Sequence, residues 1–260
     1  KVLLILFFAS YLMRNEDEIN NPKFIIQTAI LAAIPLALIV KEPDLSTTIV
    51  TFLIIASLMF VTGLSYKLVG IVLGITIPAI AILLLVIVNK GSSILQGYQS
   101  LRILAWLKPE EYPETAYQQQ NSIMAIGSGQ FFGKGLYNNS VDSVKNGNYI
   151  SEPHTDFIFS VAGEEMGFLG SVLIILLLLF IVYECIQTAK VAKDLSGKLI
   201  CSGMAALVGF QSFVNICVVT GLFPNTGLPL PFVSYGLTSL VTMYFGMGFV
   251  LNVGLQAKKY

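Results

Sequence analysis

Long uncharged hydrophobic runs, separated by short polar connections, dominate the pattern along the chain. No Asp, Glu, Lys or Arg occurs in residues 24–40, 45–66, 68–89 and 166–183, or anywhere in 199–257. A helix needs about 20 residues to cross the ~30 Å hydrocarbon core of a bilayer, and each run is close to that length or longer. The pattern therefore predicts an all-α, polytopic bundle of transmembrane helices.

Seven spans are expected, of which the first is truncated. They cover residues 2–13, 24–40, 45–63, 67–89, 156–185, 199–223 and 235–257. Three prolines within residues 224–231 stop the helix before the last span. Because the chain begins with Lys1 directly before a short apolar run, we expect a single membrane domain, residues 1–260, that lacks N-terminal helices. A long outer segment occupies about residues 90–155.

The composition agrees with a membrane protein and excludes several other classes. Hydrophobic residues make up 55% of the chain and charged residues 12%, against roughly 25% charged residues in soluble domains. A soluble fold, a disordered chain and a nucleic-acid-binding domain are excluded on these grounds. The 3 cysteines, Cys185, Cys201 and Cys217, lie in or beside apolar segments without metal-ligand spacing, so we interpret them as small hydrophobic residues.

The basic residues are distributed unevenly between the two sides of the membrane. When successive connections alternate between sides, eight basic residues fall on one side: Arg14, Lys23, Lys67, Lys190, Lys193, Lys198, Lys258 and Lys259. The short loops of the other side carry two, Lys1 and Lys41. Since short loops rich in Lys and Arg stay in the cytoplasm, the first side is predicted to be cytoplasmic. The 90–155 segment and the 224–231 loop then face outward.

Two features stand out in the outer segment. Apolar residues recur at helical spacing in residues 101–107, with Arg102 and Trp106 among them, which is typical of a helix at the membrane interface. Residues 127–135 then contain four glycines, but they match neither of the usual phosphate-loop patterns. This stretch is either a flexible turn or a backbone that lets a pyrophosphate or sugar approach closely, with Lys134 as the counter-charge.

The sharpest signal is His154-Thr155-Asp156-Phe157-Ile158-Phe159, which places the single histidine and an aspartate at the mouth of an apolar helix. In one interpretation Thr155 or Asp156 only caps that helix. Glu164 and Glu165 follow about 12 Å further along a continuous helix, where ionisable groups are costly and usually functional. We therefore expect a carboxylate cluster that faces an internal cavity. Spacing alone leaves catalysis, ion coupling and helix–helix locking open.

Five segments, in order along nearly the whole chain, resemble the SEDS family of bacterial membrane proteins, the group of RodA, FtsW and SpoVE. They are Glu42-Pro43-Asp44-Leu45-Ser46-Thr47; Tyr98-Gln99 with Arg102; Ala125-Ile126-Gly127-Ser128-Gly129 with Gly133-Lys134-Gly135; His154 to Phe159 with Gly163-Glu164-Glu165-Met166-Gly167; and Gly227-Leu228-Pro229-Leu230-Pro231-Phe232-Val233-Ser234-Tyr235-Gly236. Lys1 matches the lysine that ends the family's Pro-Ser-Glu-x-x-Lys motif.

The resemblance implies a fold of about ten helices and a peptidoglycan glycosyltransferase. Such an enzyme polymerises lipid II on the outer face of the bacterial cytoplasmic membrane, for cell shape, division or sporulation. The family's catalytic aspartate corresponds to Asp156. That residue would act as general base while a sugar hydroxyl displaces undecaprenyl pyrophosphate with inversion.

The expected substrate-binding set around Asp156 combines charged and hydrogen-bonding residues. It consists of Lys1, Arg102, Lys134, His154, Glu164, Glu165 and Ser234. Within it, Lys1, Arg102 and Lys134 are the candidates that would stabilise the leaving pyrophosphate. A divalent cation is an alternative source of that charge and the one cofactor considered, and no metal ligand is assigned.

The expected partners are lipid II, the growing glycan strand, membrane lipids and a class B penicillin-binding protein that cross-links the strands. Two other functions stay open. A flippase or transporter of a lipid-linked cell-wall precursor would suit Glu164 and Glu165 inside a span. A non-catalytic scaffold would use the outer segments as a contact surface for a transpeptidase.

Overall fold

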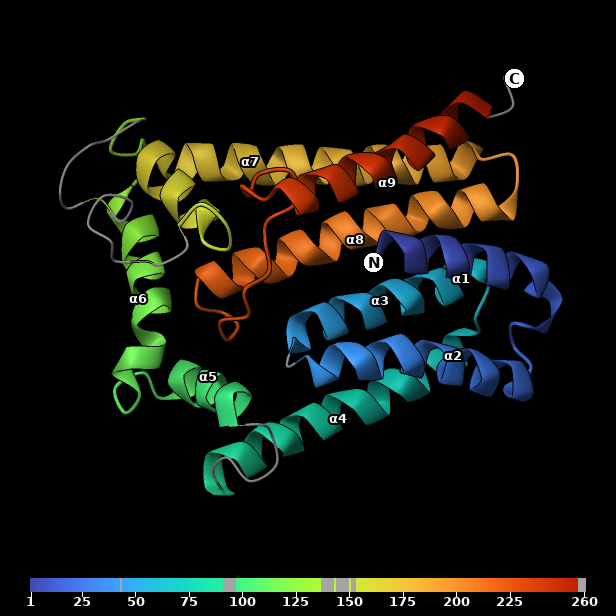
Figure 1. The fold of residues 1–260 in the computed structure, drawn as a ribbon, viewed down its shortest axis with the longest axis horizontal. Helices are drawn as coiled ribbons and strands as arrows, with labels where there is room; N and C mark the ends of the chain where they lie inside the picture. Colours follow the sequence, from blue (N-terminus) through green and yellow to red (C-terminus); the bar gives the residue numbers. More distant parts are fainter. Residues whose placement is uncertain (43, 91–96, 137–142, 144–149, 151–152, 257–260) are drawn as a thin grey trace. The chain divides into compact units, whose positions relative to one another are not determined.

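The computed structural model describes the chain except for residues 43, 91–96, 137–142, 144–149, 151–152 and 257–260. Within the described residues the secondary structure is entirely helical (Figure 1). The elements are α1 (Val2–Arg14), the 3-10 helix η1 (Glu16–Glu18), α2 (Pro22–Lys41), α3 (Leu45–Thr62), α4 (Tyr66–Lys90), α5 (Gly97–Leu107), α6 (Pro113–Ser128), α7 (Ile158–Val191), α8 (Leu195–Val219) and α9 (Leu237–Gln256).

Each predicted span contains a helix, which confirms the all-α, polytopic membrane fold. Among the described residues, five helices are long and apolar enough to cross a bilayer, namely α2, α3, α7, α8 and α9. The truncated first span is the shorter apolar helix α1. The fourth span is α4, which has 25 residues. In the outer segment, the apolar spacing of residues 101–107 correctly predicted a helix, α5.

Local sequence signals explain where several helices begin and end. Asn21 accepts a hydrogen bond from the Lys23 amide and is followed by proline at the first position of α2. Asp44 caps α3 by accepting from the Thr47 amide at 2.9 Å. Gly63 ends α3 in the left-handed region at φ 117°, a conformation that costs glycine little.

The chain divides into two compact units. Unit 1 comprises Lys1–Leu83, Phe180–Phe210 and Val241–Tyr260, and unit 2 comprises Leu84–Leu179 and Gln211–Leu240. The long helices α7 and α8 therefore contribute to both.

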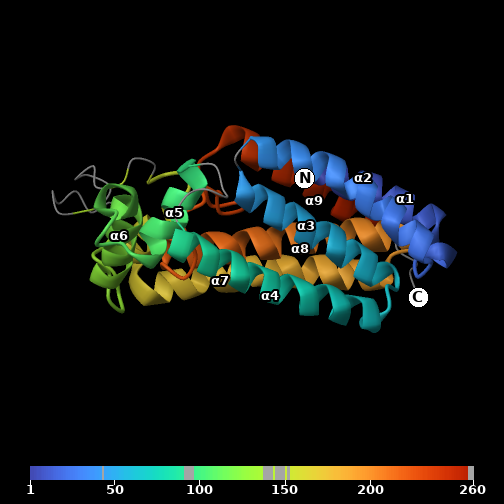
Figure 2. The same ribbon diagram turned by 90° about the horizontal axis from the view of Figure 1, so that it is seen from below.

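Unit 1 is a bundle in which α1 and α2 each contact α3. Small residues let α8 and α9 approach this core. A Cβ added at Gly203 of α8 would meet Ile5 of α1 and Leu58 of α3, and one at Gly246 of α9 would meet Met204 of α8. The second half of α7 lies beside the first half of α8 in both views (Figures 1 and 2). Unit 1 is thus held together by close helix packing.

Unit 2 contains α5 and α6, which contact each other, and the start of α7. Helix α7 is broken at Gly167, whose φ of 65° and ψ of −159° are not helical. It consists of a short segment, 158–166, and a long one, 168–191, set at an angle to it (Figure 1). The span predicted over 156–185 is thus present in α7, but it is interrupted at Gly167, which the sequence did not predict. At 1.5 Å per residue the long segment measures about 36 Å, which is enough to cross the bilayer. Glu164 and Glu165 belong to the short segment.

Candidate functional site

Asp156 lies one residue before the N-cap position of α7. Because the helix begins at Ile158, Phe157 occupies the N-cap position, and its carbonyl accepts from the amides of Ser160 and Val161. Neither Thr155 nor Asp156 therefore stands at the N-cap. Asp156 is half-buried. Its carboxylate faces Gly227, where an added Cβ would lie 3.2 Å from Oδ2.

The backbone around Asp156 is held by hydrogen bonds from α8 and the loop that follows it. Three successive carbonyls accept. That of His154 accepts from the Tyr235 amide at 2.9 Å, that of Thr155 from the Ser234 hydroxyl at 2.7 Å, and that of Asp156 from Asn215 Nδ2 at 2.8 Å. The segment is thus fixed through its main chain.

Asn215 and Ser234 extend this network into the 224–234 loop. Asn215 is 1% exposed and also donates to the Leu228 carbonyl at 2.6 Å. The Ser234 hydroxyl accepts from the Leu230 amide at 2.6 Å. Since Ser234 is buried and hydrogen-bonded inside the protein, its contact with a substrate stays a prediction. His154, by contrast, is exposed.

Glu164 forms an ion pair with Lys134. Its carboxylate is 1% exposed, and Oε1 lies 2.7 Å from Lys134 Nζ, whose side chain is 30% exposed. The buried hydroxyl of Ser143 lies 3.4 Å from Oε2. Lys134 therefore already has an anionic partner in the protein, which weakens it as a free counter-charge for a pyrophosphate.

The glycine-rich stretch packs against the break in α7. The Lys134 and Gly135 amides donate to the carbonyls of Glu164 and Glu165, and the Phe168 amide donates back to the Gln130 carbonyl. A Cβ at Gly129 would collide with the backbone of Gly163, and one at Gly133 with the backbone of Glu165. Those two glycines are therefore required for contact between two main chains. At these two positions the space that a side chain would fill is occupied by protein backbone and not by an open cradle for a phosphate.

The remaining predicted site residues lie in different surroundings. Glu165 is half-buried. Arg102, in α5, is half-buried and donates from Nη1 to the Asn225 carbonyl at 3.4 Å. Lys1 belongs to unit 1, where burial lowers the pKa of its side chain and the charge of Asp44 opposes that shift. Substrate binding by these three residues stays a prediction.

The expected carboxylate cluster stays a prediction. In the structure the Asp156 carboxylate lies beside Gly227, and that of Glu164 pairs with Lys134. Among the described residues, no group of three or more His, Cys, Asp or Glu side chains is arranged to hold a metal ion. A divalent cation at the site stays a prediction, and no step of the chemistry below depends on one.

The sequence did not predict the amide side chains that donate hydrogen bonds to the backbone around the site. Gln211 donates to the Pro229 carbonyl at 2.9 Å, four residues before Asn215 on the same face of α8. Gln119 of α6 donates to the carbonyls of Val218 and Phe223 at 2.7 and 2.6 Å. The available signal was a pair of amides four residues apart inside an otherwise apolar, uncharged span, where polar side chains need partners.

Substituting Lys134 or Glu164, the two partners of the ion pair, should lower the stability of the protein, and the two losses should differ in size. We expect Lys134→Met to cost about 2 kcal/mol of unfolding free energy, because it leaves a buried carboxylate without its cation. Glu164→Gln should cost less, since Lys134 can turn to water. The double variant should lose less than the sum of both. Chemical unfolding of the purified variants measures this, and strictly additive losses would show that the pair is not coupled.

The fold and the site define a class of protein. It is a multi-span helical membrane protein with an aspartate at the start of one helix, held there by backbone hydrogen bonds. A sequence profile of the cell cycle protein family of FtsW, RodA and SpoVE matches residues 1–259. The chain belongs to this family.

Relatives and solved structures agree with this membership. The chain is 34% identical to the "Probable peptidoglycan glycosyltransferase FtsW" of Geobacter sulfurreducens over 99% of its own length and 66% of that protein's. It is 33% identical to the protein of the same name from Buchnera aphidicola (strain Sg), over 99% of its length and 71% of that protein's. The chain thus spans slightly less than two thirds of the Geobacter protein.

Two solved structures have a similar fold. One belongs to a work on "structural coordination of polymerization and crosslinking by a peptidoglycan synthase complex", with a TM-score of 0.74, 28% identity and coverage of 98% of this chain and 68% of that one. The other is the rod shape determining protein RodA of Thermus thermophilus, with a TM-score of 0.62, 26% identity and coverage of 100% and 66%.

Proposed function

We propose that the protein is a peptidoglycan glycosyltransferase that polymerises lipid II on the outer face of the bacterial cytoplasmic membrane. The observation that carries the proposal is Asp156, a half-buried carboxylate whose backbone is held by three successive hydrogen bonds. The names of the FtsW relatives support the same activity. A carboxylate fixed in this way can meet a sugar delivered at the membrane surface.

The reaction needs one base and one stabilised leaving group. The acceptor hydroxyl attacks the anomeric carbon of the donor, the new glycosidic C–O bond forms, and the bond from that carbon to the pyrophosphate oxygen breaks. Asp156 takes the hydroxyl proton as general base. The undecaprenyl pyrophosphate leaves without a proton, and a single displacement inverts the anomeric centre.

Cationic side chains would stabilise the departing pyrophosphate. In unit 2 we assign this role first to Arg102, which lies at the 224–231 loop that also contacts Asp156. Lys134 is a weaker candidate because Glu164 already neutralises much of its charge. Lys1 stays a candidate from its match to the family motif.

The partners in this proposal are lipid II, the growing glycan strand and a class B penicillin-binding protein. The work on the similar solved structure names a complex that coordinates polymerisation with crosslinking, which supports a transpeptidase partner here. Purified full-length protein in liposomes, with that partner and labelled lipid II, tests the proposal. Glycan polymer supports it, flipped lipid without polymer identifies a transporter, and neither product identifies a scaffold.

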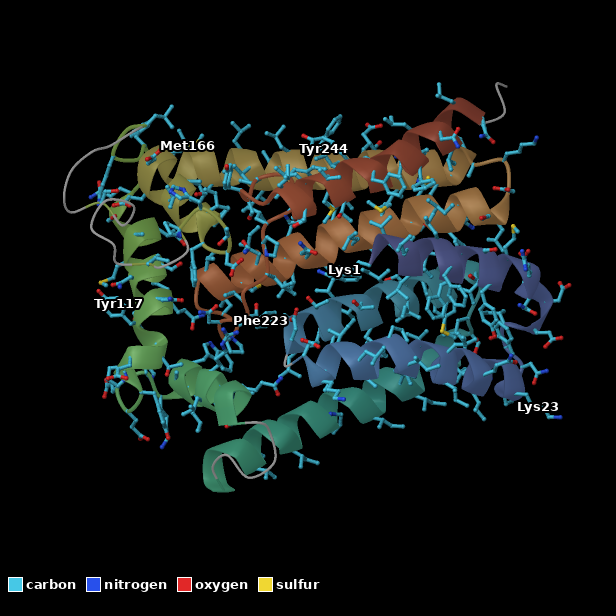
Figure 3. All side chains as sticks on the ribbon, viewed as in Figure 1. Lys1, Lys23, Tyr117, Met166, Phe223 and Tyr244 are labelled. Carbon is cyan, nitrogen blue, oxygen red and sulfur yellow. The ribbon has the colours of Figure 1, made fainter. Side chains whose placement is uncertain are left out.

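The topology makes a separate prediction. A cysteine at Tyr117 in α6, which is 51% exposed (Figure 3), should react with an impermeant thiol reagent in intact cells, whereas one at the exposed Lys193 should not. The native cysteines are buried, so the background should be low. The reverse pattern would place Asp156 on the cytoplasmic face and exclude the proposed reaction.

A further inference from the structure

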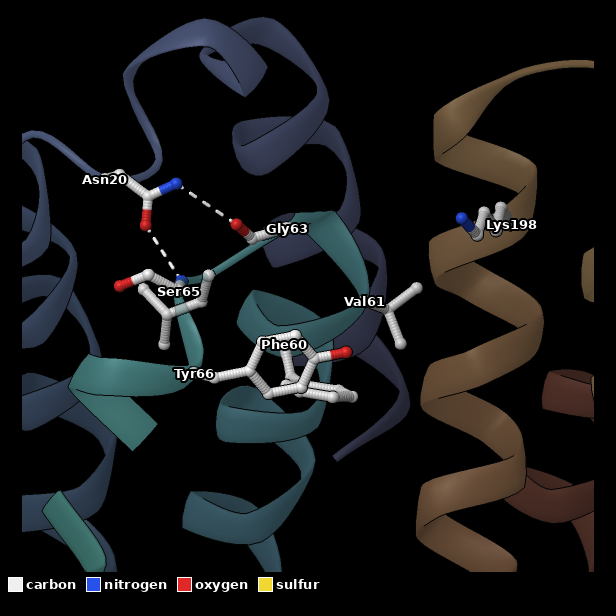
Figure 4. Close-up of a pocket in the computed structure, with 8 residues that line it drawn as sticks. Asn20, Phe60, Val61, Gly63, Ser65, Tyr66 and Lys198 are labelled. Atoms are coloured by element: carbon white, nitrogen blue, oxygen red, sulfur yellow. Dashed lines mark hydrogen bonds between the residues drawn. The ribbon is translucent and has the colours of Figure 1, made fainter. Parts of the chain in front are cut away.

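Unit 1 contains an open pocket of about 520 Å³ that the proposed reaction does not use. It lies where α3 ends and where α4 and α8 begin (Figure 4). The lining includes Asn20, Phe60, Val61, Ser65, Tyr66 and Lys198. Since these residues stand at the ends of membrane-spanning helices, the pocket lies at the depth of lipid headgroups.

Hydrogen bonds fix the wall of the pocket in advance. The side chain of Asn20 donates to the Gly63 carbonyl at 3.1 Å and accepts from the Ser65 amide at 2.8 Å, as the dashed lines in Figure 4 show. Phe60 and Tyr66 pack edge to face with ring centroids 5.7 Å apart. The turn between α3 and α4 therefore needs no rearrangement to receive a ligand.

The pocket is lined by one cationic side chain together with apolar side chains and hydroxyl groups. The exposed Lys198 directs its ammonium group toward the end of α3 (Figure 4). No ion pair involves Lys198 among the described residues, and no acidic side chain lines the pocket there. Phe60 and Tyr66 are 45% and 80% exposed. An anionic group beside an apolar chain matches this lining.

We propose that the pocket binds a glycerophospholipid with an anionic headgroup from the cytoplasmic leaflet. Lys198 contacts the phosphate, the hydroxyls of Ser65 and Tyr66 hydrogen-bond to the headgroup, and an acyl chain lies along Phe60 and Val61. The excess of basic residues in the short loops assigns this side to the cytoplasm. Anionic lipids are attracted there by basic residues, and basic pockets between membrane helices bind their headgroups.

Native mass spectrometry of the purified full-length protein in non-ionic detergent tests the site. The probes are dioleoylphosphatidylglycerol and dioleoylphosphatidylcholine, which share acyl chains and differ in net charge. We expect the anionic lipid to bind preferentially. Lys198→Glu should weaken its binding about thirtyfold, because charge reversal removes one favourable contact and adds one unfavourable contact. Lys193→Glu, an exposed lysine outside the pocket lining, is the matched control and should change it little.

Three results would overturn the proposal. Equal binding of the two lipids would mean that the groove recognises only acyl chains. Equal losses of anionic-lipid binding in Lys198→Glu and Lys193→Glu would mean that the lipid is attracted by the basic surface as a whole and not by a defined site. Displacement of the lipid by millimolar inorganic phosphate would identify a soluble anion as the ligand. Tyr66→Ala, which removes an exposed side chain, adds a second variant and should also weaken binding of the anionic lipid.

Discussion

Asp156→Asn should abolish polymerisation while leaving the fold intact. Asn cannot accept the proton of the attacking hydroxyl, so turnover should fall at least ~10²-fold. The substitution is nearly isosteric, and the three hydrogen bonds that hold residues 154–156 end on main-chain carbonyls, not on the carboxylate. The melting temperature should therefore stay close to that of the wild type. Lipid II polymerisation by the variant bound to its transpeptidase partner measures the effect.

Asp194 provides the matched control. Its Oδ1 accepts from the Gly197 amide at 2.8 Å near the start of α8, so it works as a helix cap, and Asn caps equally well. Asp194→Asn should keep both activity and stability. If Asp156→Asn also polymerises near the wild-type rate, Asp156 is structural and the base must be sought at Glu164 or Glu165.

The positions of the spanning helices along the chain could be predicted from the sequence, because the length of a hydrophobic run is a strong and local signal. Each predicted span contains a helix, and Asp156 stands where its motif placed it, at the start of α7. The signal works because each spanning helix satisfies its own backbone hydrogen bonds in the bilayer. It needs no knowledge of what packs against the helix.

The break in α7 could not be predicted in this way. Hydrophobic length does not distinguish a straight helix from one interrupted at Gly167, because a glycine inside a helical pattern is only a weak signal. Residues 130–135 form backbone hydrogen bonds with residues on both sides of the break. The ion pair between Glu164 and Lys134 was not predicted either. Contacts between segments 30 residues apart depend on the tertiary fold.

Gly129→Ala should strongly destabilise the protein, because the contact between residues 129–135 and the break in α7 is made by main chain. Gly129 has an ordinary helical φ of −71°, so alanine causes no backbone strain there. Its Cβ would instead collide with the Gly163 carbonyl. Because the backbone cannot move away as the end of a flexible side chain can, we expect a loss of about 3 kcal/mol of unfolding free energy.

Gly127→Ala, two residues earlier in α6, isolates this steric effect. A Cβ at Gly127 meets no atom within 4 Å, so alanine should be neutral or stabilise the helix by up to about 1 kcal/mol. Thermal unfolding in detergent compares the two variants, and Gly129→Ala should melt several degrees lower. Its polymerisation rate should fall as well, because Gly163 belongs to the short segment that follows Asp156. Equal melting temperatures for the two variants would show that the contact does not hold this segment in place.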